Sequence, residues 1–153
     1  MHSKLISEKG PRTFIIVLDT GEEAFQTITA FANENNILAA SLTAIGAFER
    51  ATVGWFDFDG KQYVKIPVGN QAEVLSLIGD IAEGDDGKSS LHTHAVLGLR
   101  DGSVRGGHLV EGYVRPTLEV TLVESAAHLR RKKRSDLGIA LIDLGPKLGP
   151  AVE

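Results

Sequence analysis

The chain has 153 residues, of which 42% are hydrophobic and 24% charged, and its formal net charge is −4. These values are typical of a single globular domain and exclude a disordered or fibrous protein. An acidic chain of this size is unsuited to attracting a nucleic-acid backbone over its whole surface, and the absence of cysteine excludes disulfides and thiolate-bound zinc.

No apolar run approaches the length of a membrane span, so we expect no insertion into a membrane. The apolar run near the N-terminus, TFIIVL, is too short and begins too late for a secretory signal. We therefore expect a cytoplasmic protein.

The first elements in chain order are a strand and a helix. Residues 13–19 form a short, β-rich apolar run that predicts a buried strand. Apolar side chains then follow helical spacing over residues 24–35. Thr20 is the expected N-cap of this helix, with Glu23 three residues later completing a capping box. The helix side chains expected in the core are Phe25, Ile28 and Phe31.

Strand patterns dominate the rest of the chain. Besides the histidine-rich stretch described below, strands are expected at residues 37–48, 51–58, 62–67, 114–124 and 138–145. Residues 68–81 fit either a short helical turn or a strand, because their periodicity does not separate the two. The order of elements predicts an α+β fold, in which a mainly antiparallel or mixed β-sheet packs with one main helix.

The stretch LHTHAVLGLRDGSVRGGHLVE, residues 91–111, concentrates the candidate chemistry. His92 and His94 are two residues apart, so both imidazoles leave the same face of an extended strand. The Asp101-Gly102 pair is a hairpin-turn signal, and Gly106-Gly107 removes side chains immediately before His108. If the two arms pair, the three rings converge on one small region.

Two interpretations of these histidines stay open. In the first, His92, His94 and His108 bind a divalent metal, most plausibly zinc, because neutral imidazole suits this ion and three ligands leave a fourth position for water or substrate. In the second, the three side chains satisfy hydrogen bonds in a partly buried hairpin or at a subunit interface. No residue of the sequence is singled out as catalytic.

Two carboxylates near the histidines are candidates for supporting roles. Glu111 is the nearest carboxylate after His108, but three residues along an extended strand place it on the opposite face unless a bulge intervenes. Glu119 lies in an apolar strand pattern, where it is expected to face outward or to pair with Arg105 or Arg134.

One basic run is a candidate patch for nucleic acid or a partner protein. It consists of Arg130, Arg131, Lys132, Lys133 and Arg134. The alternative is a solvated loop that balances nearby acids or binds across an interface, which the acidic character of the remaining chain favours. Trp55 and Phe56 fit the core or an interface better than a base-stacking platform.

Several segments together resemble the PPC domain, plant and prokaryote conserved, which is also called PCC. They are LSLIGDI, the stretch LHTHAVLGLRDGSVRGGHLVEGYV and PTLEVTL, with GEEAFQTITAFANENNILAASLTAIGAF and VGWFDFDGKQYVKIPV upstream. His-x-His followed by a turn and Gly-Gly-His-Leu is a narrow signature. The resemblance assigns residues 9–143 to a PPC-like domain, leaving 1–8 as an N-terminal extension and 144–153 as a loose tail.

The resemblance implies an α+β fold and a homotrimer. Plant members of the family carry AT-hook motifs, whose Arg-Gly-Arg-Pro core is missing here. Our leading hypothesis is a homotrimeric protein with a three-histidine metal site and room for a small-molecule ligand, whether or not the ligand is turned over. The alternatives are a DNA-associated regulatory or oligomerisation module, whose DNA binding the charge does not support, and a purely structural trimer.

Overall fold

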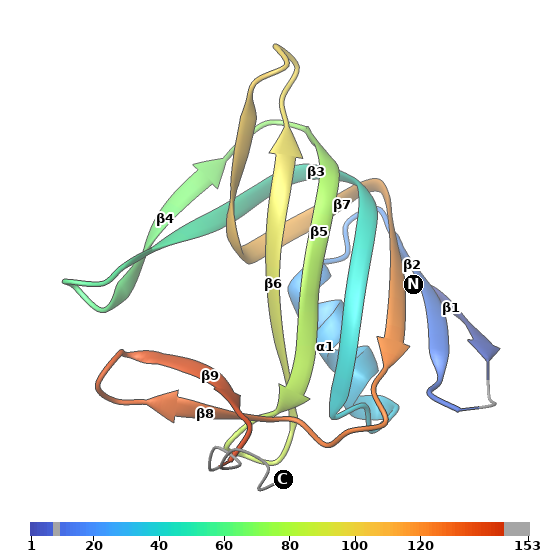
Figure 1. Ribbon diagram of the computed structural model, residues 1–153. Helices are drawn as coiled ribbons and strands as arrows, with labels where there is room; N and C mark the ends of the chain where they lie inside the picture. Colours follow the sequence, from blue (N-terminus) through green and yellow to red (C-terminus); the bar gives the residue numbers. More distant parts are fainter. Residues whose placement is uncertain (8–9, 146–153) are drawn as a thin grey trace, which may run out of the picture.

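The computed structural model describes residues 1–7 and 10–145, and within this part a single helix packs against one large, strongly bent sheet (Figure 1). The elements in chain order are β1 (His2–Ser7), β2 (Thr13–Asp19), α1 (Ala24–Glu34), β3 (Ala39–Asp57), β4 (Gln62–Val68), β5 (Ala72–Glu83), β6 (Ser89–Gly98), β7 (Val104–Glu124), β8 (Arg130–Arg134) and β9 (Ile139–Asp143). All strand pairs are antiparallel except a single parallel bridge between β5 and β8. The predicted α+β fold is therefore confirmed.

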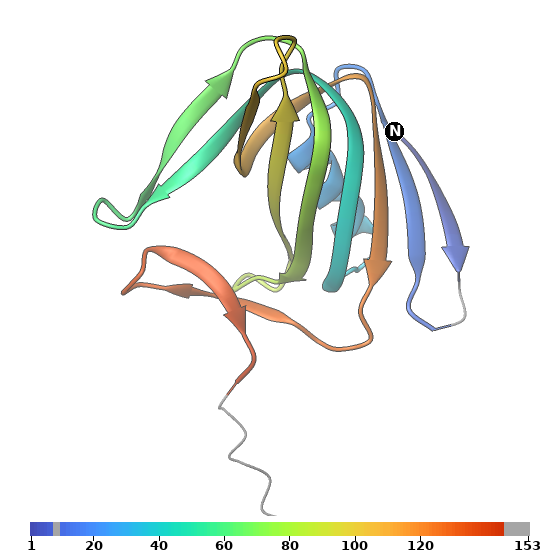
Figure 2. The ribbon, with the colours of Figure 1, turned by 45° about the horizontal axis from the view of Figure 1, so that its top comes forward.

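The sheet closes on itself around four of its strands. β3 pairs with β5, β5 with β6, β6 with β7, and β7 returns to β3. This closure requires β7 to serve two partners: its first residues pair with β6, while the rest of the strand pairs with β3. β4 extends from β3, and the β8–β9 hairpin lies below it in Figure 2.

Two strands are longer than the sequence pattern predicts. β3 runs unbroken where two strands were expected at 37–48 and 51–58, and β7 joins the Gly-Gly-His arm to residues 114–124. The register between β3 and β7 shifts at three places, so the strands bend at irregularities instead of ending there. The ambiguous residues 68–81 lie mostly in β5, a strand.

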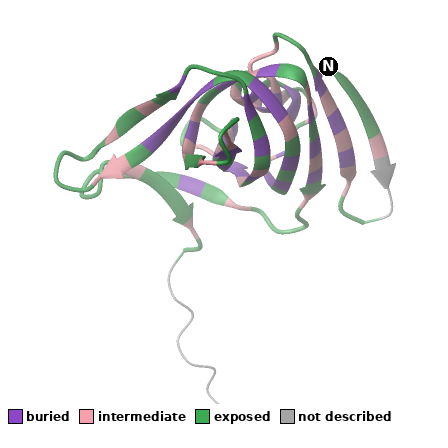
Figure 3. Cartoon of the chain, turned by 90° about the horizontal axis from the view of Figure 1, so that it is seen from above, coloured by how far each residue is buried: buried purple, intermediate pink, exposed green. Residues whose placement is uncertain are grey.

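The core lies between α1 and the inner face of the sheet, and buried and exposed residues alternate along the strands (Figure 3). Ile28 and Phe31 are buried as predicted, whereas Phe25 is only partly buried. Phe31 meets Phe14 of β2 edge to face, with ring centroids 5.3 Å apart. Trp55 is 59% exposed, which excludes the core and leaves an interface as the other of its two predicted places.

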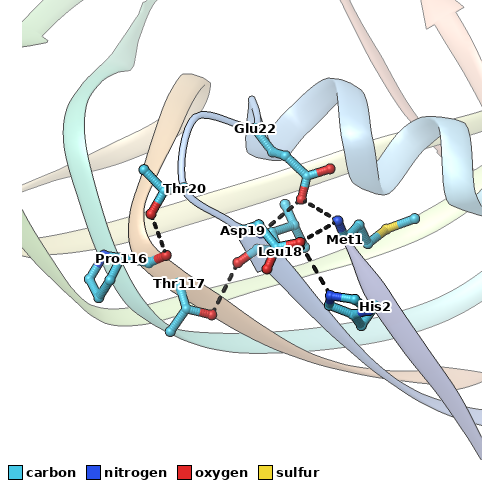
Figure 4. Close-up of polar contacts among 8 residues, drawn as sticks. All are labelled: Met1, His2, Leu18, Asp19, Thr20, Glu22, Pro116 and Thr117. Carbon is cyan, nitrogen blue, oxygen red and sulfur yellow. Dashed lines mark hydrogen bonds and ion pairs between the residues drawn. The ribbon is translucent and has the colours of Figure 1, made fainter.

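The helix begins later than the predicted cap. Its N-cap is Glu23, whose carboxylate accepts hydrogen bonds from the backbone N–H groups of Phe25 and Gln26. Thr20, the predicted N-cap, instead donates its hydroxyl to the carbonyl of Pro116, 2.8 Å away (Figure 4). The prediction failed because Gly21, with a φ of +91°, turns the chain before the helix starts.

The two ends of the described chain both join the sheet. Residues 2–7, predicted as an extension, form β1 and pair with β2. The terminal ammonium of Met1 lies 2.7 Å from Asp19 and 2.9 Å from Glu22, which fixes the start of β1 beside the end of β2 (Figure 4). Residues 146–153 of the predicted loose tail lie outside the described residues. No helix of the described part is long and apolar enough to cross a membrane.

Candidate metal centre

Three histidines meet on the outer face of the closed sheet. His94 of β6 stands opposite His108 of β7, and His92 is two residues before His94 on the same face. Their neighbours Leu91, Thr93 and Ala95 point inward and are buried. Each histidine offers one nitrogen, and the three nitrogens all lie within 4.8 Å of one another. The predicted convergence of the rings is therefore present.

Glycines allow the backbones to approach closely around this cluster. A Cβ atom at Gly79 of β5 would lie 2.2 Å from the carbonyl oxygen of His92. A Cβ atom at Gly107 would lie 2.5 Å from the carbonyl oxygen of Gly54 on β3. Side chains at these two positions would push β5 and β3 away from the strands that carry the histidines, so the cluster depends on both glycines.

His108 is held as a neutral base. Its ring stacks on Tyr63 of β4 with the centroids 4.5 Å apart. Burial, reinforced by the charges of His92, His94 and Arg131, lowers the pKa of His108 to about 4. Its Nδ1 atom is buried and has no hydrogen-bond partner within the described residues, although buried polar atoms rarely lack one. A neutral imidazole with an unpaired nitrogen is the form that binds a metal.

His92 is flanked by a carboxylate. Asp80 stands opposite His92 in the β5–β6 register, and its Oδ2 lies 3.7 Å from Nδ1 of His92. Arg131 of β8 donates a hydrogen bond to the other carboxylate oxygen of Asp80. Burial opposes the charge on Asp80, but the interactions with His92 and Arg131 prevail and lower the pKa of this carboxyl. The carboxylate is therefore ionised beside the ring.

A cavity of about 470 Å³ opens over the cluster. The three histidines and Tyr63 line it together with Ile139, Ala140 and Leu141 of β9. The turn before β9 reaches the β3–β4 turn, since a Cβ atom at Gly138 would lie 2.9 Å from that of Lys61. The β8–β9 hairpin thus contributes to the lining of the cavity, and its tip lies near the tip of the β3–β4 hairpin (Figure 2).

The donor set fits a zinc-like ion. Zn²⁺ accepts three imidazole nitrogens at about 2.1 Å, which places tetrahedral donors about 3.4 Å apart. The histidine nitrogens lie within 4.8 Å of one another, so small side-chain rotations bring them to that spacing. Burial also lowers the pKa of His94, and the charge of His92 adds to the effect. Protons therefore compete less with a metal here than at free imidazole.

The two predicted supporting carboxylates lie outside the cluster. Val110 is an extra residue in the β3–β7 register, so the bulge that would return Glu111 to the outer face exists. Glu111 nevertheless accepts a hydrogen bond from Thr52, 2.8 Å away. Glu119 is exposed on β7, so the first of its two predicted states, facing outward, is confirmed. Arg134 pairs with Asp136 instead of Glu119.

The basic run is a strand, not a loop, and most of its charges have acidic partners. Lys132 pairs with Asp143 and Arg134 with Asp136, while Arg130 lies 4.0 Å from Glu83. Arg131 is buried against Asp80. In the described part of the chain only Lys133 of the five lacks an ion pair. The structure therefore favours the interpretation that these cations balance nearby acids.

The sequence did not predict the positions of three residues near the cluster. Asp80 and Tyr63 were not expected there, and Arg131 was expected only as part of the basic run and not as a buried side chain. Asp80 and Tyr63 lie in the segments LSLIGDI and VGWFDFDGKQYVKIPV that carry the family resemblance, but their spacing gives no sign of a role at the cluster. Asp80 could have been found only from the register of β5 against β6, and Arg131 is hidden among four other cations that face solvent.

Comparisons with known proteins agree with this geometry. The family model of the Plants and Prokaryotes Conserved (PCC) domain matches residues 6–126. A plant- and prokaryote-conserved (PPC) protein from Pyrococcus horikoshii is 33% identical, with a TM-score of 0.82 over 94% of this chain and 100% of that one. A metal-containing protein from Archaeoglobus fulgidus is 34% identical, with a TM-score of 0.79 over 90% and 97%.

A third solved structure, a candidate DNA-binding protein from Bacteroides thetaiotaomicron, is 25% identical, with a TM-score of 0.83 over 92% of this chain and 96% of that one. A comparison with curated proteins found no match.

Proposed function

This chain belongs to the Plants and Prokaryotes Conserved (PCC) domain family, and we propose that it binds one zinc-like divalent ion through His92, His94 and His108. The observation that carries the proposal is the convergence of three imidazole nitrogens, one of them in a ring with a buried, unpaired Nδ1. The name of the Archaeoglobus relative, a metal-containing protein, adds support.

Three neutral ligands leave both charges of the ion uncompensated, so the cavity favours a small anionic or carbonyl ligand at the open position. A bound zinc ion supplies Lewis acidity and lowers the pKa of a bound water to about 7. The chain itself contributes the apolar wall of β9, which limits access of water, and the ring of Tyr63, which holds His108 in place.

Metal analysis of protein purified without a histidine tag tests this proposal. We expect about one zinc ion per chain in the wild type and none in the variant His92→Ala/His94→Ala. The matched control is His128→Ala, because His128 is exposed and pairs with Glu83 away from the cluster. Full metal content in the double variant, or no metal in the wild type, would contradict the assignment.

We also propose that the protein assembles as a homotrimer, as the family resemblance implies. The support is an apolar patch on the outer face of the sheet, where Ile45, Leu75 and Ile78 are each more than half exposed and line one shallow depression. Exposed apolar patches of this kind mark interaction surfaces. Ile78 pairs with His94 in register, so a neighbouring copy would lie beside the metal site.

Sedimentation equilibrium tests the assembly. We expect the mass of three chains for the wild type and a smaller species for Ile78→Asp. The control is Val64→Asp, because Val64 is exposed on β4 and does not line this depression. A monomeric wild type would contradict the proposal.

DNA binding is the alternative function, and it is less well supported. It rests on the description of the Bacteroides relative, whereas four of the five clustered cations here face acidic partners. A gel-retardation assay separates the two: DNA binding that weakens steeply with salt and is lost on neutralising residues 130–134 would favour the alternative.

A further inference from the structure

The β8–β9 hairpin lies beyond the segment that the family model matches, which ends at residue 126. Its backbone attachment to the main sheet is slight: the parallel bridge joins Arg130 to Glu83, and the N–H of Glu83 donates to the carbonyl of Leu129 at 2.8 Å. The hairpin nevertheless forms one wall of the cavity over the histidines. Side chains must therefore contribute to holding it there.

Arg131 is the side chain of β8 that enters the protein. It is 5% exposed, whereas the other four residues of the strand face solvent. One guanidinium nitrogen donates to the carbonyl oxygen of Ser90 at 2.7 Å, and the other donates to Asp80. The guanidinium thus bridges β6 and β5 directly beside the histidine-bearing segment.

Asp80 connects Arg131 to His92, one of the three proposed metal ligands. Its Oδ1 accepts from Arg131, and its Oδ2 faces Nδ1 of His92 at 3.7 Å. The first contact fixes the carboxylate, and the second turns Nδ1 of His92 toward it, which leaves Nε2 for the ion. Carboxylate partners of this kind fix the tautomer and orientation of metal-binding histidines.

We propose that Arg131 is a positioning residue for the metal site: it fixes Asp80, and Asp80 fixes the ring of His92. The β8–β9 hairpin therefore sets the affinity and geometry of metal binding although it contributes no ligand. This inference rests on the proposed function, because it concerns the same site.

A second arginine–carboxylate pair on the same hairpin, Arg134 and Asp136, does not contact the histidine cluster and serves as a comparison. Arg134 donates to both carboxylate oxygens of Asp136, at 3.0 and 2.7 Å, and both side chains are more than half exposed. Among the residues that the structure describes, Asp136 makes no ion pair or hydrogen bond with a histidine. Asp136→Asn and Arg134→Lys are therefore matched controls for the same two changes at Asp80 and Arg131.

The test measures zinc dissociation constants by competition with a chelator in full-length variants. Asp80→Asn keeps an acceptor for Arg131 but turns an amide N–H₂ toward Nδ1 of His92, which favours the tautomer protonated at Nε2. We expect zinc binding to weaken 10- to 100-fold, the range typical of lost outer partners. Arg131→Lys keeps the charge but cannot bridge Ser90 and Asp80, so we expect a smaller loss, of about 10-fold. The two controls should stay within 2-fold.

Two spectroscopic measurements separate positioning from general stability. The visible absorption of the Co²⁺-loaded protein should change in Asp80→Asn and not in Asp136→Asn. In the metal-free protein, the ¹⁵N shifts of His92 should show the Nδ1-protonated tautomer, and this preference should be lost in Asp80→Asn. A purely structural role would leave both signals unchanged in the folded variant.

The outcomes distinguish this inference from the proposed function. Unchanged zinc affinity and Co²⁺ spectra in Asp80→Asn and Arg131→Lys, with zinc bound by the wild type, would overturn the inference and leave the metal site standing. A wild type that binds no zinc would overturn both. If Arg131→Lys does not fold, Asp80→Asn decides the question, because the Asp80 side chain is 36% exposed and tolerates an amide.

Discussion

Two buried or half-buried arginine–carboxylate pairs connect distant parts of this chain, and they have different consequences. Arg12 donates to both oxygens of Glu124, at 2.8 and 2.7 Å, and to the carbonyl of Asn35 at 3.1 Å. This pair joins the start of β2, the end of β7 and the end of α1. Arg131 joins β8 to β5 and β6 and leaves one oxygen of Asp80 facing His92.

The difference lies in how the carboxylate is used. Both carboxylate oxygens of Glu124 accept hydrogen bonds from the Arg12 guanidinium, so this pair connects β2, β7 and α1 and contacts no histidine of the cluster. Asp80 divides its oxygens between an arginine and a histidine, so the same chemical motif holds an element and orients a ligand. We therefore distinguish a framework region around Arg12 and Glu124 from a histidine region around Arg131, Asp80 and His92. Changes in the first should affect stability alone, and changes in the second should affect stability and metal binding together.

The largest effects are expected from two glycines: Gly79 lies in the histidine region, and Gly46 lies outside it. A Cβ atom at Gly46 would lie 2.2 Å from the carbonyl oxygen of Thr117, and at Gly79 it would lie equally close to that of His92. Gly46→Ala and Gly79→Ala should each cost about 3 kcal/mol of unfolding free energy, because backbone atoms must move. Only Gly79→Ala should also weaken zinc binding. Denaturant unfolding and zinc titration of both variants check this, and an unaltered affinity in Gly79→Ala would argue against the distinction.

The next largest losses of stability are expected from replacing Arg12 or Arg131. Arg12→Met and Arg131→Met keep the length of the side chain but remove the charged hydrogen bonds, which should cost about 2–3 kcal/mol of unfolding free energy in each case. Zinc affinity should fall in Arg131→Met and remain at the wild-type value in Arg12→Met. The comparison would fail if Arg12→Met altered the metal affinity, since the framework region would then be coupled to the site.

The three histidines were the part of the site that local sequence pattern predicted best. Spacing alone placed His92 and His94 on one face, and the Asp101-Gly102 turn brought His108 opposite His94. The PPC resemblance and the strand-rich pattern also gave the fold class. These features depend on contacts within one hairpin, where register follows from the turn.

What the pattern missed depends on contacts that are distant in sequence. Arg131 lies in a run of five cations whose composition indicates solvent exposure, yet it alone of the five is buried. Likewise β3 and β7 bend through bulges that carry no turn signal, so each was predicted as two strands. The N-cap was misplaced because Thr20 fits a capping box equally well on sequence grounds.

The free energy of unfolding should depend on pH, and the histidine region and the framework region should lose stability in different pH ranges. Histidine titrates near pH 6.5 in an unfolded chain, whereas burial lowers the pKa of folded His108 to about 4. Between these values the unfolded chain binds a proton that folded His108 does not, so the metal-free protein should lose about 1–3 kcal/mol as the pH falls from 6.5 to 4. The Arg12 hydrogen bonds lower the pKa of Glu124 below 4.5, so its contribution is present above that value and is lost at lower pH.

Unfolding curves of the metal-free protein at several pH values test whether the stability that depends on His108 is lost at higher pH than the stability that depends on Glu124. His108→Phe keeps a ring to stack on Tyr63 and should reduce the loss above pH 4.5, leaving the part that His94 contributes. Glu124→Gln should remove only part of the loss below pH 4.5. A wild-type stability that stays flat between pH 6.5 and 4.5 would contradict a neutral, buried His108.

The smallest effects are expected at the two carboxylates that sequence spacing offered as supporting residues. Glu111 accepts a hydrogen bond from Thr52, and Glu119 is exposed on β7, so neither belongs to the histidine region by contact. Glu111→Gln should cost less than about 1 kcal/mol because an amide oxygen still accepts from Thr52, and Glu119→Gln should be neutral within about 0.5 kcal/mol. Zinc titration of both variants should give the wild-type affinity within 2-fold. A loss of 10-fold or more in Glu119→Gln would instead place this side chain beside the metal of a neighbouring copy, because no contact within the described chain connects it to His92, His94 or His108.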